Sequence, residues 1–165
     1  LAAATEQATR KHGEAASVPA DASAAPLFDK ASMMGHGESV LVVDDVQEQR
    51  QLATSLLIKL GYQGHAVSSG EEAVEYLKSN KADLLVLDMI MDPGIDGLET
   101  YQRVLEINPQ QKAIIVSGFS ENDRSKEARR LGVGAYVKKP YRTEKLGLAV
   151  RKELDSTLVK TKALS

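Results

Sequence analysis

Apolar residues along the chain occur either in short continuous runs or at helical spacing. Five short segments predict strands, and the continuous apolar runs among them predict buried ones, because a strand of a parallel sheet with both faces covered is apolar at every position. These strands are expected at residues 39–43, 62–67, 83–87, 112–116 and 134–137. Each run is followed by a segment whose apolar residues recur every three or four positions, which indicates an amphipathic helix.

The clearest helical spacing follows the first strand. There Ala53, Leu56, Leu57 and Leu60 lie on one helical face, and Gly61 provides the stop. Five strands alternating with five helices predict a parallel sheet with helices on both faces. Because crossovers between parallel strands are right-handed, we expect a flavodoxin-like, doubly wound α/β fold, (βα)5, with strand order 2-1-3-4-5.

The beginning of the chain has a different composition. Residues 1–37 are rich in Ala, Ser and Thr and contain few large apolar side chains, so burial cannot offset their ordering entropy. We expect a flexible linker or tail there; the alternative is a short helix over residues 2–12, where good helix formers gather. The folded domain is expected over 38–158, followed by a C-terminal tail over 159–165.

Polar side chains stand at the ends of the predicted strands. Asp44 and Asp45 follow the first strand, Asp88 the third, Ser117 the fourth and Lys139 the fifth. In a parallel sheet these C-terminal strand ends gather on one edge, where open α/β sheets bind their ligands. Each Asp alone could be a helix cap or a turn residue, but the alignment of all five argues against that interpretation.

Three carboxylates at this edge would repel one another. At ~4 Å and an effective dielectric near 20, each pair costs on the order of 4 kcal/mol. Either their pKa values rise or a cation binds, and oxygen-only ligands suit Mg²⁺. Three acids, Mg²⁺ and Lys139 sum to formal neutrality, so the site could accept a dianionic phosphoryl group. Asp88 would then be the nucleophile that forms an acyl phosphate, with Lys139 and Ser117 binding phosphoryl oxygens.

These motifs resemble those of one family. They read Val-Val-Asp44-Asp45, Leu-Asp88-Met, Val-Ser117-Gly and Tyr136-Val-Lys-Lys139-Pro140. Over residues 38–155 the chain resembles the bacterial response-regulator receiver domain of two-component phosphorelays. The resemblance implies that Asp88 is the phosphoacceptor. It also implies that Asp45, Asp88 and the backbone carbonyl of Ile90 bind Mg²⁺ directly, with Asp44 holding the metal through water.

The resemblance also implies a switch. Ser117 would be the switch hydroxyl, Lys139 the phosphate-binding lysine, and Tyr136 the aromatic that swings inward when Ser117 moves toward the phosphoryl group. The alternative interpretation is that Tyr136 is a half-buried strand residue. The Lys139–Pro140 peptide bond matches one that is usually cis in the family. We expect an output face made of the helix over 121–131, the fifth strand and Tyr136.

The loop after Asp88 departs from the family pattern. Receivers usually place Pro four residues after the phosphoacceptor, whereas Pro93 is five after it, so we expect one extra residue near Asp92. Ile90 and Phe119 are large and apolar where many relatives differ. Both would flank the path of an attacking water, and we expect them to alter the lifetime of the acyl phosphate, without a predicted direction.

Composition restricts the function further. The net charge is −2 and the pI near 6.0, so no nucleic-acid or anionic-membrane surface is predicted. The absence of Cys excludes disulfides, thiolate metal sites and Cys nucleophiles. No apolar run approaches the ~20 residues of a membrane span, and a cytoplasmic location is expected. None of the three His residues lies in an acidic helical context that resembles a kinase phosphodonor box, so this chain is expected to receive phosphate.

Three functions remain open from the sequence. The first is the C-terminal receiver of a hybrid sensor histidine kinase, because a linker-like segment precedes the domain and no output domain is evident. The second is a free single-domain response regulator. Either would be served by a histidine kinase or a histidine phosphotransfer protein, and the family resemblance implies phosphorylation-dependent homodimers. The third, a Mg²⁺-dependent aspartyl-phosphate hydrolase, would need an acid two residues after the nucleophile, where this chain has Ile90.

Overall fold

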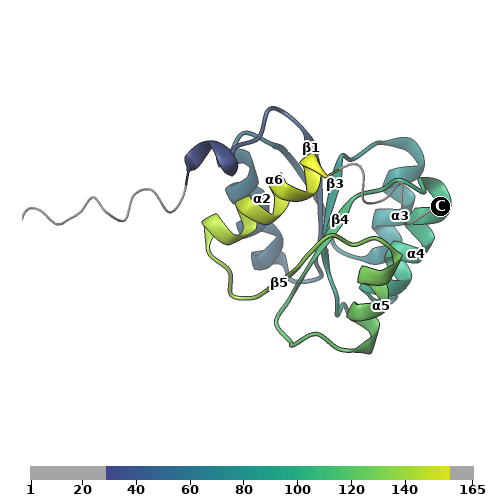
Figure 1. Ribbon diagram of the computed structural model, residues 1–165. Helices are drawn as coiled ribbons and strands as arrows, with labels where there is room; N and C mark the ends of the chain where they lie inside the picture. The colour runs from purple at the N-terminus through teal and green to yellow at the C-terminus, as the bar shows by residue number, and fades with distance from the viewer. Residues whose placement is uncertain (1–28, 157–165) are drawn as a thin grey trace, which may run out of the picture. The chain divides into compact units, whose positions relative to one another are not determined.

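A five-stranded parallel sheet forms the centre of the protein. The computed structural model describes residues 29–156 (Figure 1). The strands are β1 (Ser39–Val43), β2 (Gln63–Val67), β3 (Leu84–Asp88), β4 (Ala113–Ser117) and β5 (Tyr136–Lys138). Their order in the sheet is β2-β1-β3-β4-β5, and every neighbouring pair is parallel. The predicted flavodoxin-like fold and its strand order are therefore confirmed.

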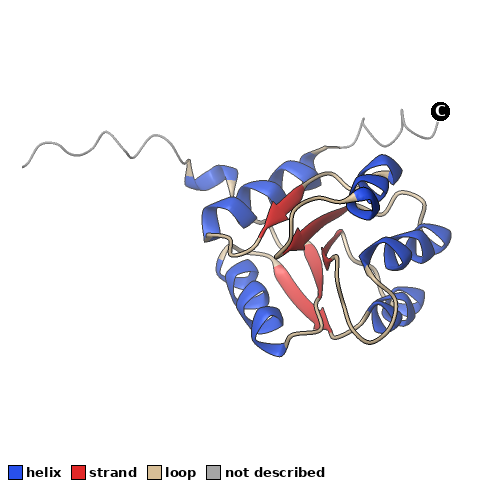
Figure 2. Ribbon diagram, turned by 90° about the horizontal axis from the view of Figure 1, so that it is seen from below, coloured by secondary structure: helices blue, strands red, loops and turns tan. Residues whose placement is uncertain are grey.

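Helices cover both faces of the sheet. They are α2 (Gln47–Lys59), α3 (Gly70–Ser79), α4 (Gly97–Ile107), α5 (Asp123–Leu131) and α6 (Thr143–Asp155); a short 3-10 helix, η2 (Lys30–Ser32), lies ahead of the sheet in the chain. Helices α2 and α6 pack on one face, while α3, α4 and α5 pack on the other (Figures 1 and 2). Among the described residues no helix is long and apolar enough to cross a membrane.

Alternation along the strands divides the core into two layers. Leu41 and Leu85 point toward α3, α4 and α5, whereas Val40 and Leu84, one residue earlier in each strand, point toward α2 and α6. All four side chains are fully buried. Strands β3 and β4 are buried at every position, which explains why their sequences are continuous apolar runs rather than alternating ones.

Strand boundaries shift slightly from those expected, and one shift concerns the site. β3 ends on Asp88 rather than one residue before it, and β4 ends on Ser117. The register pairs Asp88 with Val116 and Ser117 with Lys138. The ladder therefore sets the backbone positions of the phosphoacceptor candidate and of the residue before Lys139.

The stretch just before β1 packs against the domain, although the sequence placed it in a linker. Met33 is only 8% exposed and belongs to the core layer of α2 and α6. The Gly35 N–H donates to the Leu60 carbonyl at 2.6 Å, and the Gly37 N–H donates to the Gly61 carbonyl at 2.9 Å. The helix considered over residues 2–12 and the proposed tail lie outside the described residues.

Candidate functional site

Three carboxylates meet at the C-terminal edge of the sheet. Asp44 and Asp45 follow β1, and Asp88 ends the neighbouring β3. One oxygen from each carboxylate lies within 4.8 Å of the others. Asp44 is 3% exposed and Asp88 6%, so two of the three charges are nearly withdrawn from water. The structure thus brings together the acids that the strand ends predicted.

Lys139 is the positive charge of this cluster. Its Nζ lies 2.7 Å from Asp44 Oδ2 and 3.8 Å from Asp88 Oδ2. The backbone N–H of Lys139 donates to the Ser117 carbonyl at 2.7 Å, which aligns the end of β5 with the end of β4. The Lys139–Pro140 peptide bond is cis, as the family resemblance implied, and the Asp92–Pro93 bond is cis as well.

The electrostatics of the cluster raise the pKa of Asp88. Burial is the largest cause and raises the pKa to about 6; nearby Lys139 opposes this effect, and the Asp44 carboxylate adds to it. Burial also raises the pKa of Tyr141 to about 12, with the Asp44 and Asp88 charges adding to the effect. Lys139 therefore does not offset the effect of burial and of the neighbouring acids, and a further cation would favour the ionised form of Asp88.

The donor set fits Mg²⁺. The three carboxylates provide oxygen ligands only, which is what this hard cation prefers, and they leave room for water and for substrate oxygens. The loop after β3 helps to hold the Asp45 carboxylate, because the Asp92 N–H donates to its Oδ2 at 3.3 Å. The backbone N–H of Ile90 donates to Asp88. The predicted role of the Ile90 carbonyl as a metal ligand stays a prediction.

Side chains far away in the sequence hold the loop between β3 and α4. The Ile95 N–H donates to Glu71 Oε2 of α3 at 3.1 Å, and Gly94 adopts a positive φ of 111° against the same carboxylate. Asp96 caps α4 by accepting the Glu99 N–H at 2.9 Å. Both Asp96 oxygens also accept hydrogen bonds from Arg124 of α5.

The sequence analysis did not predict the roles of Glu71 and Arg124 in holding the loop between β3 and α4. No local signal marks these two residues, because each lies more than twenty residues from its partner. Their sequence neighbourhoods read simply as helix starts.

The loop between β4 and α5 is held differently. Ser117 is buried, and its Oγ accepts the Phe119 N–H at 3.3 Å. The Tyr136 hydroxyl donates to the Phe119 carbonyl. Ser117 and Tyr136, the two candidate switch residues, are therefore connected through the backbone of Phe119. Among the described residues, no hydrogen bond joins Tyr136 to the acidic cluster. Their switching roles stay predictions.

Comparison with known proteins agrees with this geometry. Residues 40–151 match the family model of the response regulator receiver domain. Sporulation initiation phosphotransferase F of Bacillus subtilis is 32% identical over 117 residues, 71% of this chain and 94% of that protein. Chemotaxis protein CheY of Thermotoga maritima is 30% identical over 118 residues, covering 70% and 97%.

Two further matches are a partial match to a much longer protein and a match to a solved structure. The autoinducer 1 sensor kinase/phosphatase LuxN of Vibrio harveyi is 39% identical over 82 residues, 50% of this chain but 10% of that protein. A CheY-like receiver domain structure from Methanospirillum hungatei superposes with a TM-score of 0.68 over 76% of this chain and 98% of that one, at 22% identity, which supports the fold. The chain belongs to the response regulator receiver domains of two-component signalling systems.

Proposed function

We propose that Asp88 accepts a phosphoryl group from a phosphohistidine and that the acyl phosphate switches a protein-interaction face. The observation that carries this proposal is the buried Asp88 carboxylate beside two further acids and 3.8 Å from Lys139. A carboxylate so placed is costly to keep ionised unless the site binds a further cation, and a cation there would also attract an anionic phosphoryl group.

The proposed reaction assigns a role to each of these side chains. An Asp88 carboxylate oxygen attacks phosphorus, the P–N bond of the donor phosphohistidine breaks, and the imidazole nitrogen keeps the bonding pair. Asp44, Asp45 and Asp88 would hold Mg²⁺, which would neutralise charge between the carboxylates and the phosphoryl oxygens. Lys139 would move from Asp44, 2.7 Å away, toward a phosphoryl oxygen on Asp88. Ser117 would donate to another phosphoryl oxygen.

Chemical labelling tests this assignment. Acetyl phosphate with Mg²⁺ is expected to add one acid-labile phosphoryl group, measured by intact mass, and Asp88→Asn is expected to abolish the addition. Asp92→Asn is the matched control, because it removes an exposed loop acid and is expected to leave labelling intact. Full labelling of the Asp88 variant would overturn the proposal.

The switch is proposed to travel through the loop between β4 and α5. If Ser117 Oγ turns to the phosphoryl group, it gives up the bond from the Phe119 N–H, and the Phe119 carbonyl that binds Tyr136 moves with it. Amide NMR shifts on beryllofluoride addition are expected to concentrate in α5, β5 and Tyr136. Amides of α3 are the internal reference, and unchanged shifts in α5 and β5 would contradict the switch.

We propose that the chain acts as the C-terminal receiver of a hybrid sensor histidine kinase. The LuxN similarity supports this context, while the nearly full-length matches to phosphotransferase F and CheY support the alternative of a free single-domain regulator. A kinase catalytic core encoded directly upstream of Leu1 would establish the first, and a start codon there the second. Phosphotransfer profiling against candidate histidine kinases and phosphotransfer proteins would then identify the donor.

A further inference from the structure

The start of α3 contacts the loop between β3 and α4 at two neighbouring residues. The Ile95 side chain packs against Gly70, where a Cβ atom would lie 2.7 Å from the Ile95 Cγ1. The next residue of the helix, Glu71, accepts the Ile95 N–H at 3.1 Å. None of the three clustered acids comes from β2 or α3, so this contact is how α3 takes part in the site.

The backbone of Gly94 lies against the same Glu71 carboxylate. Gly94 has a φ of 111°, a conformation that favours glycine. A Cβ atom at Gly94 would lie 2.7 and 2.9 Å from the two Glu71 carboxylate oxygens, closer than a Cβ atom can approach. The carboxylate therefore contacts two consecutive residues of the loop, Gly94 and Ile95, and the first of these contacts requires glycine.

The other part of the loop reaches the acidic cluster at Asp92. The Asp92 N–H donates to Asp45 Oδ2 at 3.3 Å, and among the described residues this is the one hydrogen bond that the Asp45 carboxylate accepts. Asp92 lies two residues before Gly94, so a displacement of the loop backbone at Gly94 would also move the Asp92 N–H. Hydrogen bonds of this kind orient the carboxylates that bind metals, and their loss commonly weakens metal binding about 10- to 100-fold.

We propose that Glu71 is a positioning residue for the Mg²⁺ site. By holding the backbone of Gly94 and Ile95, it keeps the Asp92 N–H on the Asp45 carboxylate, and so keeps that carboxylate turned toward the cation. The inference rests on the metal site of the proposed function. Because Glu71 is exposed and acts through the loop, we expect its loss to weaken Mg²⁺ binding less than the loss of a direct ligand contact would.

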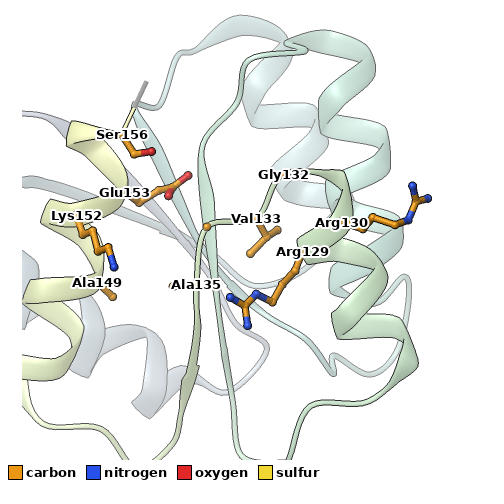
Figure 3. A pocket seen from close by; sticks show the side chains of 10 residues that line it. Arg129, Arg130, Gly132, Val133, Ala135, Ala149, Lys152, Glu153 and Ser156 are labelled. Atoms are coloured by element: carbon orange, nitrogen blue, oxygen red, sulfur yellow. The ribbon is translucent and has the colours of Figure 1, made fainter. Parts of the chain in front are cut away.

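A second contact between a glycine and a glutamate provides a control far from the site. A Cβ atom at Gly134 would overlap the carboxylate of Glu153, which lies in the wall of a cavity of about 400 Å³ between α5 and α6 (Figure 3). The Gly134 N–H donates to the carbonyl of Ala113, the first residue of β4, at 2.9 Å. This contact therefore lies at the edge of the sheet opposite to Asp88, and disturbing it is not expected to reach the metal site.

A Mg²⁺ titration of the full chain without a phosphodonor, followed by amide NMR, tests the proposal. Glu71→Ala is expected to raise the Kd for Mg²⁺ about three- to ten-fold and to speed hydrogen exchange of the Asp92 amide in metal-free protein. Gly94→Ala is expected to do the same with every charge retained, because its Cβ would displace the Glu71 carboxylate. Glu71→Gln keeps an acceptor for the Ile95 N–H and is expected to retain most of the affinity.

Two controls separate the position of the loop from charge and from stability. Glu75→Gln removes the same charge from an exposed position of α3, where Glu75 pairs with Lys78 at 3.2 Å. Gly134→Ala disturbs the distant contact with Glu153 and is expected to lower the urea midpoint of unfolding. Both variants are expected to bind Mg²⁺, and to exchange the Asp92 amide, as the unmodified protein does.

Each outcome decides one question. An unchanged Kd and unchanged Asp92 exchange in Glu71→Ala would overturn the proposal. An equal loss of affinity in Glu75→Gln would replace it with a simple charge effect, and an equal loss in Gly134→Ala with a general loss of stability. If Gly94→Ala does not fold, the two Glu71 variants still decide. Failure of the unmodified protein to bind Mg²⁺ would reject the metal site itself, whereas binding that the Glu71 variants leave unchanged would reject this inference alone.

Discussion

The two loops that border Asp88 are held in opposite ways. The loop over residues 89–96 places Met89 and Met91 in the core, 3% and 5% exposed, and receives side chains from α3 and α5. The loop over residues 118–122 is exposed throughout, and the side chain of Phe119 is 62% exposed. It is held by one hydrogen bond to Ser117, one from Tyr136, the Glu121–Arg129 ion pair and the Asn122 cap of α5, all from residues close to it in the chain or on β5 and α5.

This difference suggests that the two loops beside Asp88 have different roles. A site for a metal ion and a phosphoryl group needs side chains fixed to within a fraction of an ångström, and a loop anchored by two buried Met side chains suits that need. A switch needs an element whose alternative position costs little, and such elements come from the low-stability regions of a fold. The same short edge of the sheet contains a loop of each kind.

The largest test of this contrast is truncation of a buried loop side chain. Met91→Ala is expected to cost about 2–4 kcal/mol of unfolding free energy, because it leaves a cavity in the core. Phe119→Ala, the matched change in the other loop, is expected to stay within about 0.5 kcal/mol. Urea denaturation with chelator present measures both, and similar losses would show that the two loops are equally anchored.

The next test concerns the charge of the Asp88 carboxylate, directly before this loop. Folding raises the pKa of Asp88 from 3.8 to about 6, so the folded state retains a proton that the unfolded state loses, and stability falls as pH rises between those values. In metal-free protein at about pH 7.5, Asp88→Asn is expected to be more stable than the unmodified protein by up to about 3 kcal/mol.

The advantage of this variant should shrink toward pH 4, where the unmodified Asp88 is protonated, and it should also shrink when Mg²⁺ is added. Thermal unfolding across pH, with and without chelator, measures it. A pH-independent difference would assign the stabilisation to packing rather than to charge.

A smaller effect is expected from the helix caps that end the two loops. Asp96 caps α4 and also binds Arg124 of α5, whereas Asn122 caps α5 within its own capping box with Ser125. Asp96→Ala is expected to cost about 1–2 kcal/mol and Asn122→Ala about 1 kcal/mol. A double-mutant cycle with Arg124→Ala isolates the bridge, and a coupling near zero would mean that it does not tie α5 to the loop.

Much of this architecture was readable from sequence because it depends on local pattern. Continuous apolar runs predicted β1, β3 and β4, and the handedness rule for crossovers helped to predict the order of the five strands. Asp44, Asp45, Asp88 and Lys139 were predicted to meet because strand ends meet in a parallel sheet. Each inference needed only residue type and position along the chain.

The side-chain contacts that hold the loop over residues 89–96 were not predictable in this way. Glu71 accepts a hydrogen bond from the Ile95 N–H, and Arg124 donates to the Asp96 side chain. Both residues lie at the start of a helix, and their sequence neighbours show nothing unusual. The positive φ at Gly94 and the burial of Met91 likewise depend on how α3 and α4 pack. The extra residue expected near Asp92 stays a prediction, whereas the conformation of this loop depends on tertiary contacts.

The packed stretch ahead of β1 has a mechanical consequence. Arg151 of α6 donates to the Met34 carbonyl at 3.2 Å and forms ion pairs with Glu38 and Asp155. The Tyr62 ring lies so close to Gly35 that no larger residue would fit there without rearrangement. A force applied to the chain ahead of this stretch would therefore be transmitted to α6 through these hydrogen bonds and ion pairs.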